Sequence, residues 1–414
     1  MLSNKTMIKN FIIENFDKCI RVNKKDDGTL IGLPYPYTVP CVSGMFQEMY
    51  YWDTYFTNVG LILSGKIEQA KNNVNNMLYL VEKYGFMPNG NRTFYLRSSQ
   101  PPYLSLMVRD IYAATKDKEW LLNAVESLKI EYSFWYNRRN TKIGLNQYNF
   151  NRENTSKEYA FSELKTRLPL ENYISDEEKR LEHFICNTES GWDLNPRWGF
   201  EGFNFVQVDL NCLLYAMEYN IAFFENELNR DNCEWLKRAE ARKKLIYRYL
   251  WNEEKAMFLD YNFVTEKHSD VCSAASFYPL FTEIADDDMA QKTAKNLLSE
   301  LETEFGILTC GNHNVPGIYQ WDAPQGWAPL HYIAVKGLLN YNINDSAFRI
   351  AKKYLSTVEN NYQKTGRLWE KYNVADGSIN TNNEYDMPAM LGWSAGVYLY
   401  FEKIICEGDK NAFL

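Results

Sequence analysis

The stretch from Tyr51 to Tyr84 reads YWDTYFTNVGLILSGKIEQAKNNVNNMLYLVEKY, and it decides the fold. Apolar residues recur about every 3.6 positions on both sides of Ser64-Gly65, so the pattern predicts helices over 51–63 and 67–84. Because the connection between them is short, the two helices should lie antiparallel as a hairpin.

The same pattern recurs along the rest of the chain. Four more pairs of helices are expected, at 102–114 with 119–135, 205–227 with 233–250, 272–284 with 288–302, and 328–339 with 346–362. A sixth pair needs both ends of the chain, with 390–405 lying beside 7–20. Six hairpins can close into a ring of inner and outer helices. The sequence therefore predicts an all-α fold, an (α/α)6 toroid, built from residues 1–414 as one domain.

Longer non-helical stretches should carry function at one end of this ring. They are expected at 28–50, 86–101, 139–204, 305–327 and 364–388. A small β excursion is expected near 256–263, because MFLDYNF alternates between apolar and polar residues.

Composition narrows the possible partners. The 414 residues carry 45 Lys and Arg against 53 Asp and Glu, a net charge of −8, which argues against a nucleic-acid partner. Aromatic content is high, with 30 Tyr, 23 Phe and 11 Trp. Since Trp and Tyr stack on flat ligand faces while their polar tips form hydrogen bonds, a sugar or a base is a reasonable ligand.

Cysteine and histidine usage gives no sign of a metal site. The eight cysteines are scattered singly without a C-x-x-C pair, which favours free buried thiols in a reducing compartment. None of the four histidines is spaced i, i+4 from another. No apolar run approaches a membrane span, and the N-terminal stretch lacks the apolar core of a signal peptide. We expect a cytoplasmic protein with no cofactor, no metal and no membrane partner; no pattern predicts its oligomeric state.

Four stretches place aromatic residues next to carboxylates. They are Glu48–Asp53, Glu189–Asp193, Gln320–Trp327 and Trp369–Tyr372, and all lie in or at the edge of the expected loops. An indole lowers the local dielectric constant and can raise the pKa of a neighbouring carboxyl into the range of a general acid, while its face stacks on a pyranose ring. The clusters therefore indicate a carbohydrate site with acid–base chemistry.

These stretches resemble the trehalases, the glycoside hydrolases of family 37. VSGMFQEMYYWDTY at 42–55 is similar to the first signature, P-G-G-R-F-x-E-x-Y-x-W-D-x-Y, and QWDAPQGWAP at 320–329 matches the second, Q-W-D-x-P-x-G-W-x-P. Between and after them come PNGNR at 88–92, SQPP at 99–102, ESGWD at 189–193 and EKY at 370–372. The resemblance covers nearly the whole chain, and it implies an (α/α)6 fold and hydrolysis of a small α-linked glucoside with inversion.

The resemblance also implies roles for single residues. Asp193 falls on the family's general acid and Glu370 on its base, the pair that inversion requires on opposite faces of the sugar. Matching substrate-binding positions are Trp52, Asp53, Asn89, Gln100, Glu171, Gly191 and Glu384. The carboxylate and tryptophan clusters add Trp192, Arg197 and Trp321 to the expected binding site.

Some family positions differ here. Met45, Ser98 and Leu170 stand where trehalases carry arginines, although Arg97 and Arg167 lie close by in the chain. The alternatives are thus hydrolysis of another α-glucoside, as by oligosaccharide α-glucosidases or hydrolases of glycosyl-glycerate, and a sugar-binding protein without turnover.

Each of these residues also has a purely structural alternative. Asp193 could cap a helix, and Glu370 could be a surface carboxylate paired with Lys371. Asp322 could brace its loop by accepting backbone hydrogen bonds. Trp52, Asp53, Asn89, Gln100 and Trp321 could likewise serve packing or loop structure instead of ligand binding.

Overall fold

Helices dominate the computed structural model, which describes residues 4–150, 176–381 and 385–408. The thirteen α-helices within those residues are α1 (Asn4–Phe16), α2 (Tyr51–Leu63), α3 (Ile67–Tyr84), α4 (Leu104–Thr115), α5 (Lys118–Arg138), α7 (Glu177–Ser190), α8 (Val208–Glu227), α9 (Cys233–Leu250), α10 (Tyr278–Phe281), α11 (Asp287–Leu301), α12 (Ala328–Asn340), α13 (Asn344–Thr365) and α14 (Gly392–Glu407).

The strands are only two or three residues long and form small antiparallel pairings. They are β1 (Ile20–Arg21), β2 (Tyr37–Thr38), β3 (Phe205–Val206), β4 (Trp251–Asn252), β5 (Met257–Phe258), β6 (Tyr261–Asn262), β7 (Lys267–His268), β8 (Gln325–Trp327) and β9 (Lys371–Asn373). β1 pairs with β2, β6 lies between β3 and β7, β4 pairs with β5, and β8 pairs with β9. The β excursion expected near 256–263 is therefore confirmed as β5 and β6.

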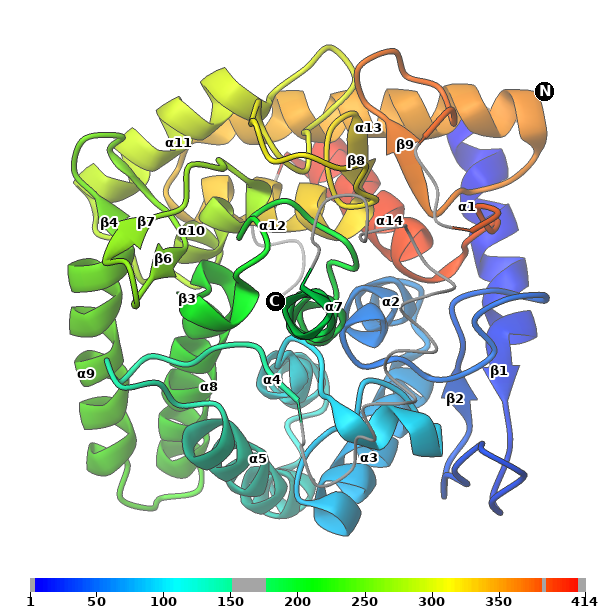
Figure 1. Cartoon of the computed structure of the whole chain (residues 1–414). Coiled ribbons are helices and arrows are strands. Elements are labelled where there is room, and N and C mark those ends of the chain that lie inside the picture. The colour runs from blue at the N-terminus through cyan, green and yellow to red at the C-terminus, as the bar shows by residue number, and fades with distance from the viewer. Residues whose placement is uncertain (1–3, 151–175, 382–384, 409–414) are drawn as a thin grey trace.

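Six helices form a closed inner ring. α2, α4, α8, α10, α12 and α14 each pack against the next, and α14 returns to α2. The helices α3, α5, α9, α11, α13 and α1 lie outside this ring (Figure 1). This arrangement confirms the (α/α)6 toroid expected from the paired helices.

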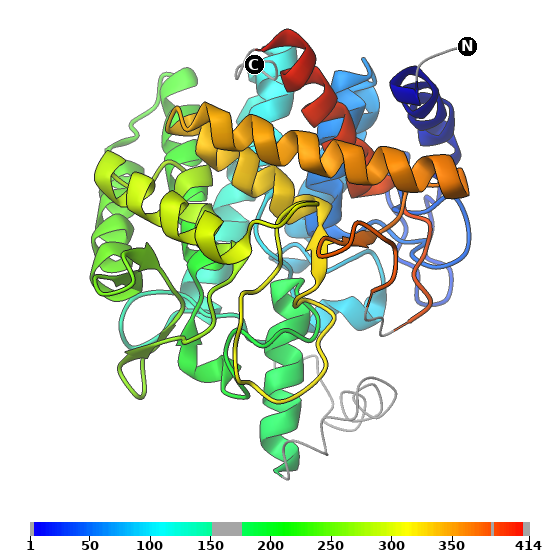
Figure 2. The ribbon, with the colours of Figure 1, turned by 90° about the horizontal axis from the view of Figure 1, so that it is seen from above.

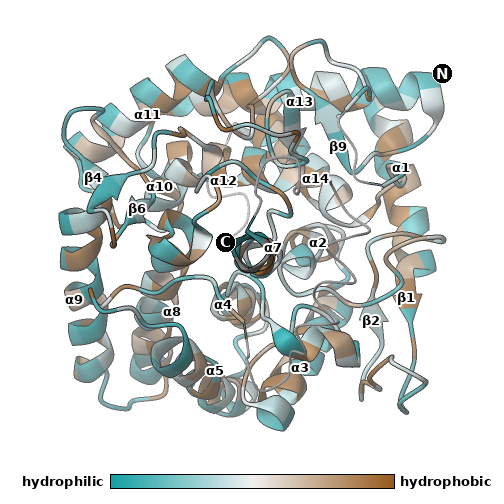
Figure 3. Cartoon of the chain, in the orientation of Figure 1, coloured by the Kyte–Doolittle hydropathy of each residue, from teal (hydrophilic) through white to brown (hydrophobic). Residues whose placement is uncertain are grey.

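The pattern of buried side chains on each helix explains which helices lie outside the inner ring. On α13 the buried residues Ala347, Ile350, Ala351, Tyr354 and Val358 recur at helical spacing on one face, as an amphipathic surface helix requires. Inner helices such as α2 and α12 are buried over nearly their whole length. The outer helix α9 is accordingly mostly hydrophilic in colour in Figure 3. Within the described residues no helix combines the length and apolarity that a membrane crossing needs.

Two glycines allow α2 and α14 to close the ring. A Cβ on Gly396 would lie 1.9 Å from the carbonyl oxygen of Phe56, and one on Gly60 would lie 2.7 Å from the Cα of Gly396. No side chain fits between backbones that approach this closely. The first and last inner helices therefore depend on glycine at both positions.

Gly396→Ala should destabilise the fold, because α14 must move away from α2 to make room for the methyl group. We expect the free energy of unfolding, measured by urea denaturation, to fall by about 1–3 kcal/mol. Gly311→Ala is the matched control, since a Cβ there meets its nearest atom at an ordinary 3.6 Å. Equal stability of the two variants would show that the ring closure tolerates a side chain.

Two helical expectations need correction. The stretch 139–204 was expected to be non-helical, yet it contains α7, whose Leu181, Phe184 and Ile185 form a small hydrophobic cluster with Leu194 and Tyr319. The apolar stripe is short because the helix projects from the loop end of the ring (Figure 2), and the last turn of α7 is held by the buried ion pair of Glu189 with Arg139. The stretch 272–284 is a 3-10 turn followed by the four-residue α10 instead of one helix.

The sixth pair of helices, expected between the two ends of the chain, also differs from the prediction. Lys9 of α1 forms an ion pair with Glu402 of α14 at 2.9 Å, so the two ends of the chain do meet. However, α14 packs most extensively against α2 and α13, while α1 packs against α13, where Phe11 meets Tyr362 edge to face. The outer position of α1 is therefore held largely by its neighbour in the outer layer.

Candidate active site

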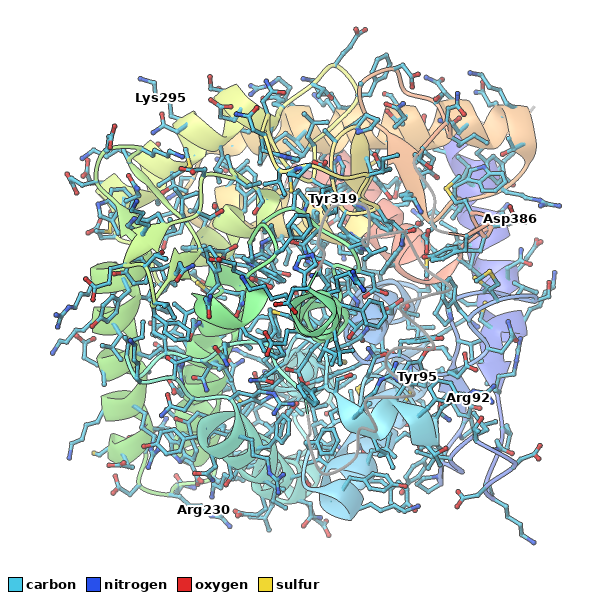
Figure 4. The ribbon with its side chains drawn as sticks, in the orientation of Figure 1. Arg92, Tyr95, Arg230, Lys295, Tyr319 and Asp386 are labelled. Atoms are coloured by element: carbon cyan, nitrogen blue, oxygen red, sulfur yellow. The ribbon has the colours of Figure 1, made fainter. Side chains whose placement is uncertain are left out.

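A cavity of about 340 Å³ lies where the loops of the ring converge on the starts of the inner helices. Nine of its twenty lining residues are aromatic, and three carboxyl groups, Asp53, Asp193 and Glu370, face into it. The aromatic residues are Phe46, Tyr50, Trp52, Phe94, Tyr95, Trp321, Trp327, Tyr385 and Trp393. In Figure 4 Tyr95 lies beside Arg92 on the loop next to α3, whereas Arg230 and Lys295 lie at the rim of the ring.

The fold brings these residues together from distant parts of the chain. Trp52 and Asp53 lie in the first turn of α2, and Trp393 lies in the first turn of α14. The pairing of β8 with β9 places Trp327 opposite Lys371, the residue that follows Glu370. Ring closure and this strand pair therefore put both ends of the sequence into one site.

Glu370 is almost fully buried, at 2% exposure, and both of its carboxylate oxygens accept hydrogen bonds. The Lys371 ammonium donates to Oε2 at 2.7 Å, and the Tyr385 hydroxyl donates to Oε1 at 2.7 Å. Trp393 Nε1 donates to the Glu370 main-chain oxygen at 2.9 Å. Since an adjacent cation and a hydroxyl donor both favour the charged form of a carboxylate, this surrounding suits a base. The alternative of an exposed surface pair with Lys371 does not hold.

The surroundings of Asp53 disfavour the charged form of its carboxyl group. Burial, then the nearby Glu370 charge and more weakly that of Asp193, raise the pKa of the Asp53 carboxyl to about 8. Asp53 therefore carries its proton at neutral pH and can donate a hydrogen bond.

Asp53→Asn should make the free energy of unfolding less dependent on pH. The folded state keeps the Asp53 proton up to a pKa of about 8, whereas the ordinary value is 3.8. The unfolded chain therefore binds fewer protons between these values, and stability falls as the pH rises, by up to about 1.4 kcal/mol per pH unit from this group. In urea denaturation, the variant should gain stability relative to wild type between about pH 5 and pH 7.

Asp345→Asn, at an exposed site on α13, is the matched control for the replacement of a carboxyl by an amide outside the cavity. A difference between Asp53→Asn and wild type that stays constant with pH would mean that Asp53 is ionised at neutral pH.

Gly191 positions the segment that carries Asp193. Its φ of +72° is a left-handed conformation, and a Cβ there would lie 2.9 Å from the Trp52 ring. Glycine is therefore required for the chain to pass the indole. Asp193 follows two residues later, and no helix begins at it, so the alternative of a helix cap does not hold.

Glu189 ties this segment to the opposite wall. Its carboxylate accepts hydrogen bonds from the backbone N–H groups of Ser99 at 3.0 Å and Asn149 at 2.6 Å. The Arg139 guanidinium donates to both of its oxygens, at 2.8 and 2.7 Å. Glu189 is fully buried, so it fixes the loop carrying Gln100 relative to the loop carrying Asp193.

Trp192 and Arg197 lie behind the cavity wall instead of lining it. Trp192 stacks on Trp321 with ring centroids 5.4 Å apart, and the Arg197 guanidinium lies 4.5 Å from the Trp192 ring. Arg197 is fully buried and forms ion pairs with Asp209 at 2.6 Å and Asp260 at 3.0 Å. Both residues therefore support the wall that Trp321 presents to the cavity.

The remaining expected residues divide into two groups. Asn89 and Gln100 line the cavity, and Gln100 Oε1 also accepts the Trp52 N–H at 3.2 Å, so it supports the start of α2 as well. Glu171 and Glu384 lie outside the described residues, as do Leu170 and Arg167.

Of the residues that stand where trehalases carry arginines, one lines the cavity and another does not. Ser98 and Arg97 line the cavity, whereas Met45 is 43% exposed and is not part of the described wall. Arg97 therefore places a guanidinium in the site next to the serine that replaces a family arginine.

The contacts of Asp322 agree with a structural role, in which its carboxylate braces the loop. Its carboxylate accepts the Ala323 N–H at 2.7 Å and lies 2.9 Å from His313 Nε2, while His313 Nδ1 accepts the Val315 N–H. These contacts brace the loop that presents Gln320 and Trp321.

Several wall residues escaped sequence reasoning. Tyr385 directly follows the expected residue Glu384, and this adjacency could have identified it. Trp393, inside the helical pattern of α14, resembles a core residue, and Phe94 and Tyr95 carry no local signal that separates them from packing aromatics. Phe46 falls on the Phe of the first signature, and this match could have identified it. Lys371 was considered only as a surface partner, because its burial depends on the pairing of β8 with β9.

Comparison with known proteins gives a consistent result. The family model described as Trehalase matches residues 6–405. The periplasmic trehalase of Salmonella paratyphi C (strain RKS4594) is 33% identical over 94% of this chain and 71% of its own length. That of Escherichia coli (strain SMS-3-5 / SECEC) is 33% identical over 92% of this chain and 71% of its own length.

Solved structures share the architecture. Neutral trehalase Nth1 from Saccharomyces cerevisiae superposes with a TM-score of 0.75 at 26% identity, over 98% of this chain and 81% of that one. The GH63 mannosylglycerate hydrolase from Thermus thermophilus, in complex with glucose, gives a TM-score of 0.65 at 17% identity, over 95% of this chain and 100% of that one. At this identity the second likeness concerns the fold alone.

The expected cytoplasmic location was wrong, because these curated relatives are periplasmic trehalases. The expectation rested partly on scattered cysteines. All eight cysteines are free and six of them are buried. Thiols buried apart from one another cannot pair in any compartment, so their spacing carries no information on location.

Proposed function

Because the chain belongs to the trehalase family, we propose that it hydrolyses α,α-trehalose to glucose, with inversion at the attacked carbon. One observation carries the mechanism: Asp193 and Glu370 face the same aromatic cavity, and Glu370 is held by a buried lysine. The family is a family of glycoside hydrolases, and a cavity of about 340 Å³ is of the size that small-molecule sites have.

In the proposed reaction Asp193 is the general acid and Glu370 the general base. Asp193 gives its proton to the glycosidic oxygen as the bond from that oxygen to the anomeric carbon breaks. Glu370 takes a proton from water, whose oxygen bonds to the anomeric carbon from the opposite face. One glucose leaves with the original oxygen and the other is released as the β-anomer.

The other polar residues of the cavity are proposed to bind the sugar hydroxyls. Protonated Asp53 would donate, and the Asn89 and Gln100 amides can donate and accept. Trp52 and Trp321 would stack on the apolar faces of the pyranose rings. Gly191, whose backbone passes the Trp52 ring, completes this wall.

Expected residues outside the lining complete the proposal. Glu171 and Glu384 would add acceptors for the hydroxyls, while Trp192 and Arg197 act through the wall that they support. We also propose that residues 1–414 act as one catalytic domain, because the inner ring closes only when α14 meets α2.

Proton NMR during the first turnovers tests the proposal. Trehalose should release α- and β-glucose in equal amounts before mutarotation changes their ratio, because only the attacked anomeric carbon is inverted. Initial release of α-glucose from both halves would contradict inversion. In a panel with kojibiose, nigerose, maltose, sucrose and glucosyl-glycerate at equal concentration, trehalose should be hydrolysed fastest; faster hydrolysis of another member would assign a different α-glucoside.

A further inference from the structure

A second cavity, of about 690 Å³, lies inside the ring at the end opposite the candidate active site. All six inner helices contribute to its wall, through Tyr55, Asp110, Phe223, Phe281, Lys336 and Tyr400. α2, α12 and α14 each begin at the active-site cavity, and their later turns reach this second cavity. In Figure 2 α14 accordingly runs away from the end that carries α7.

Tyrosines separate the two cavities. The Tyr55 and Tyr332 hydroxyls lie 3.4 Å apart, and those of Tyr103 and Tyr278 lie 2.6 Å apart. Tyr55 stacks on Tyr103, which in turn lies against Trp52. The second cavity is therefore a separate compartment and not an extension of the active site.

Asp110 is the feature of this cavity that most needs an explanation. Its half-buried carboxylate has no hydrogen-bond or ion-pair partner among the described residues. Burial raises its pKa to about 6, although the Lys336 and Arg109 charges oppose that rise. Enclosed carboxylates are normally satisfied by donors, so a ligand hydroxyl group is the kind of partner that this group lacks.

Arg109 supplies donors on the same wall. Its guanidinium carbon lies 4.2 Å from the centre of the Phe223 ring, and its Nη1 donates to Asn220 Oδ1 at 2.9 Å. These contacts hold the guanidinium plane in place and leave it further N–H groups for a ligand. A fixed donor thus stands beside the carboxylate acceptor Asp110.

We propose that this second cavity is a binding site for a neutral polyhydroxyl ligand of mono- or disaccharide size. A sugar hydroxyl can donate to Asp110 and accept from Arg109 at once, and the surrounding aromatic rings suit the apolar faces of a pyranose. Three cationic and two anionic side chains line the cavity, so their charges nearly cancel. A multiply charged anion gains little from such a wall.

Glucose is the probe, because the protein does not consume it. Isothermal titration should give one glucose site per chain fewer for Asp110→Leu, which removes the acceptor, than for wild type. Ala113→Trp, which fills the cavity from its wall without changing a charge, should lack the same site. Lys353→Met, on the outside of α13, is the control and should keep the wild-type number of sites.

Three results would overturn the proposal. Wild type could bind no more glucose than the two molecules that the active site can hold, or the Asp110→Leu and Ala113→Trp variants could both retain the wild-type number of sites. Inorganic phosphate could instead displace glucose from the second site, which would identify an anion site at Arg109 and Lys336. Trehalose turnover by Ala113→Trp and its melting temperature show whether the ring is intact, and both should match wild type.

Discussion

Asp193→Asn and Glu370→Gln are each expected to lower trehalose turnover by about 10² to 10⁴, the usual contribution of one general acid or base. Each amide keeps the shape of the carboxyl group but can neither give nor take the required proton. Trehalose binding should survive in both variants, because the cavity wall is unchanged. Steady-state kinetics and calorimetric binding measure the two effects separately.

A substrate whose leaving group needs no proton distinguishes the two roles. α-Glucosyl fluoride should be hydrolysed nearly normally by Asp193→Asn, whereas Glu370→Gln still lacks the base that activates water. Asp345→Asn and Glu304→Gln, at exposed positions outside the cavity, are the matched controls and should keep wild-type turnover. Equal rescue of both cavity variants by the fluoride, or near-normal trehalose turnover in either, would show that the roles are assigned to the wrong residues.

Lys371→Met is expected to move the acid limb of the pH–rate profile upward. The lysine is fully buried and its ammonium lies 2.7 Å from the Glu370 carboxylate, and a cation this close favours the ionised form of a carboxylate. Without it, Glu370 must lose its proton next to Asp53 and Asp193 with no ammonium group in contact. Turnover at a fixed pH on that limb should therefore fall about tenfold for each pH unit by which the limb moves.

Stability should fall in the same variant, since removing one partner of a buried ion pair typically costs about 3–5 kcal/mol. Lys353→Met is the matched control: Lys353 also lies 2.7 Å from a glutamate, Glu302, but on the outer helix α13. Its profile should not move. A uniform loss of turnover by Lys371→Met, with the acid limb in place, would mean that the lysine serves packing alone.

Local sequence determined most of the helices. The apolar pattern of 51–63, 67–84 and 233–250 predicted α2, α3 and α9 with their observed bounds. These helices are amphipathic or fully apolar over many turns, and their ends carry local signals such as Gly85, which ends α3 at a φ of +80°. α7 and α10 lacked such a signal: the first carries only a short apolar stripe, and the second is a single turn.

The sequence by itself also placed the candidate acid and base, because ESGWD and EKY are short motifs whose residues are adjacent in the chain. Tertiary structure alone decided their chemistry. Asp53 and Glu370 are 317 positions apart, yet Glu370 raises the pKa of Asp53, and Glu370 itself is held by Tyr385 and by a lysine that β8 and β9 bury. A charge acts through space and burial, so protonation is determined by which groups the closed ring brings together, and no local pattern records that.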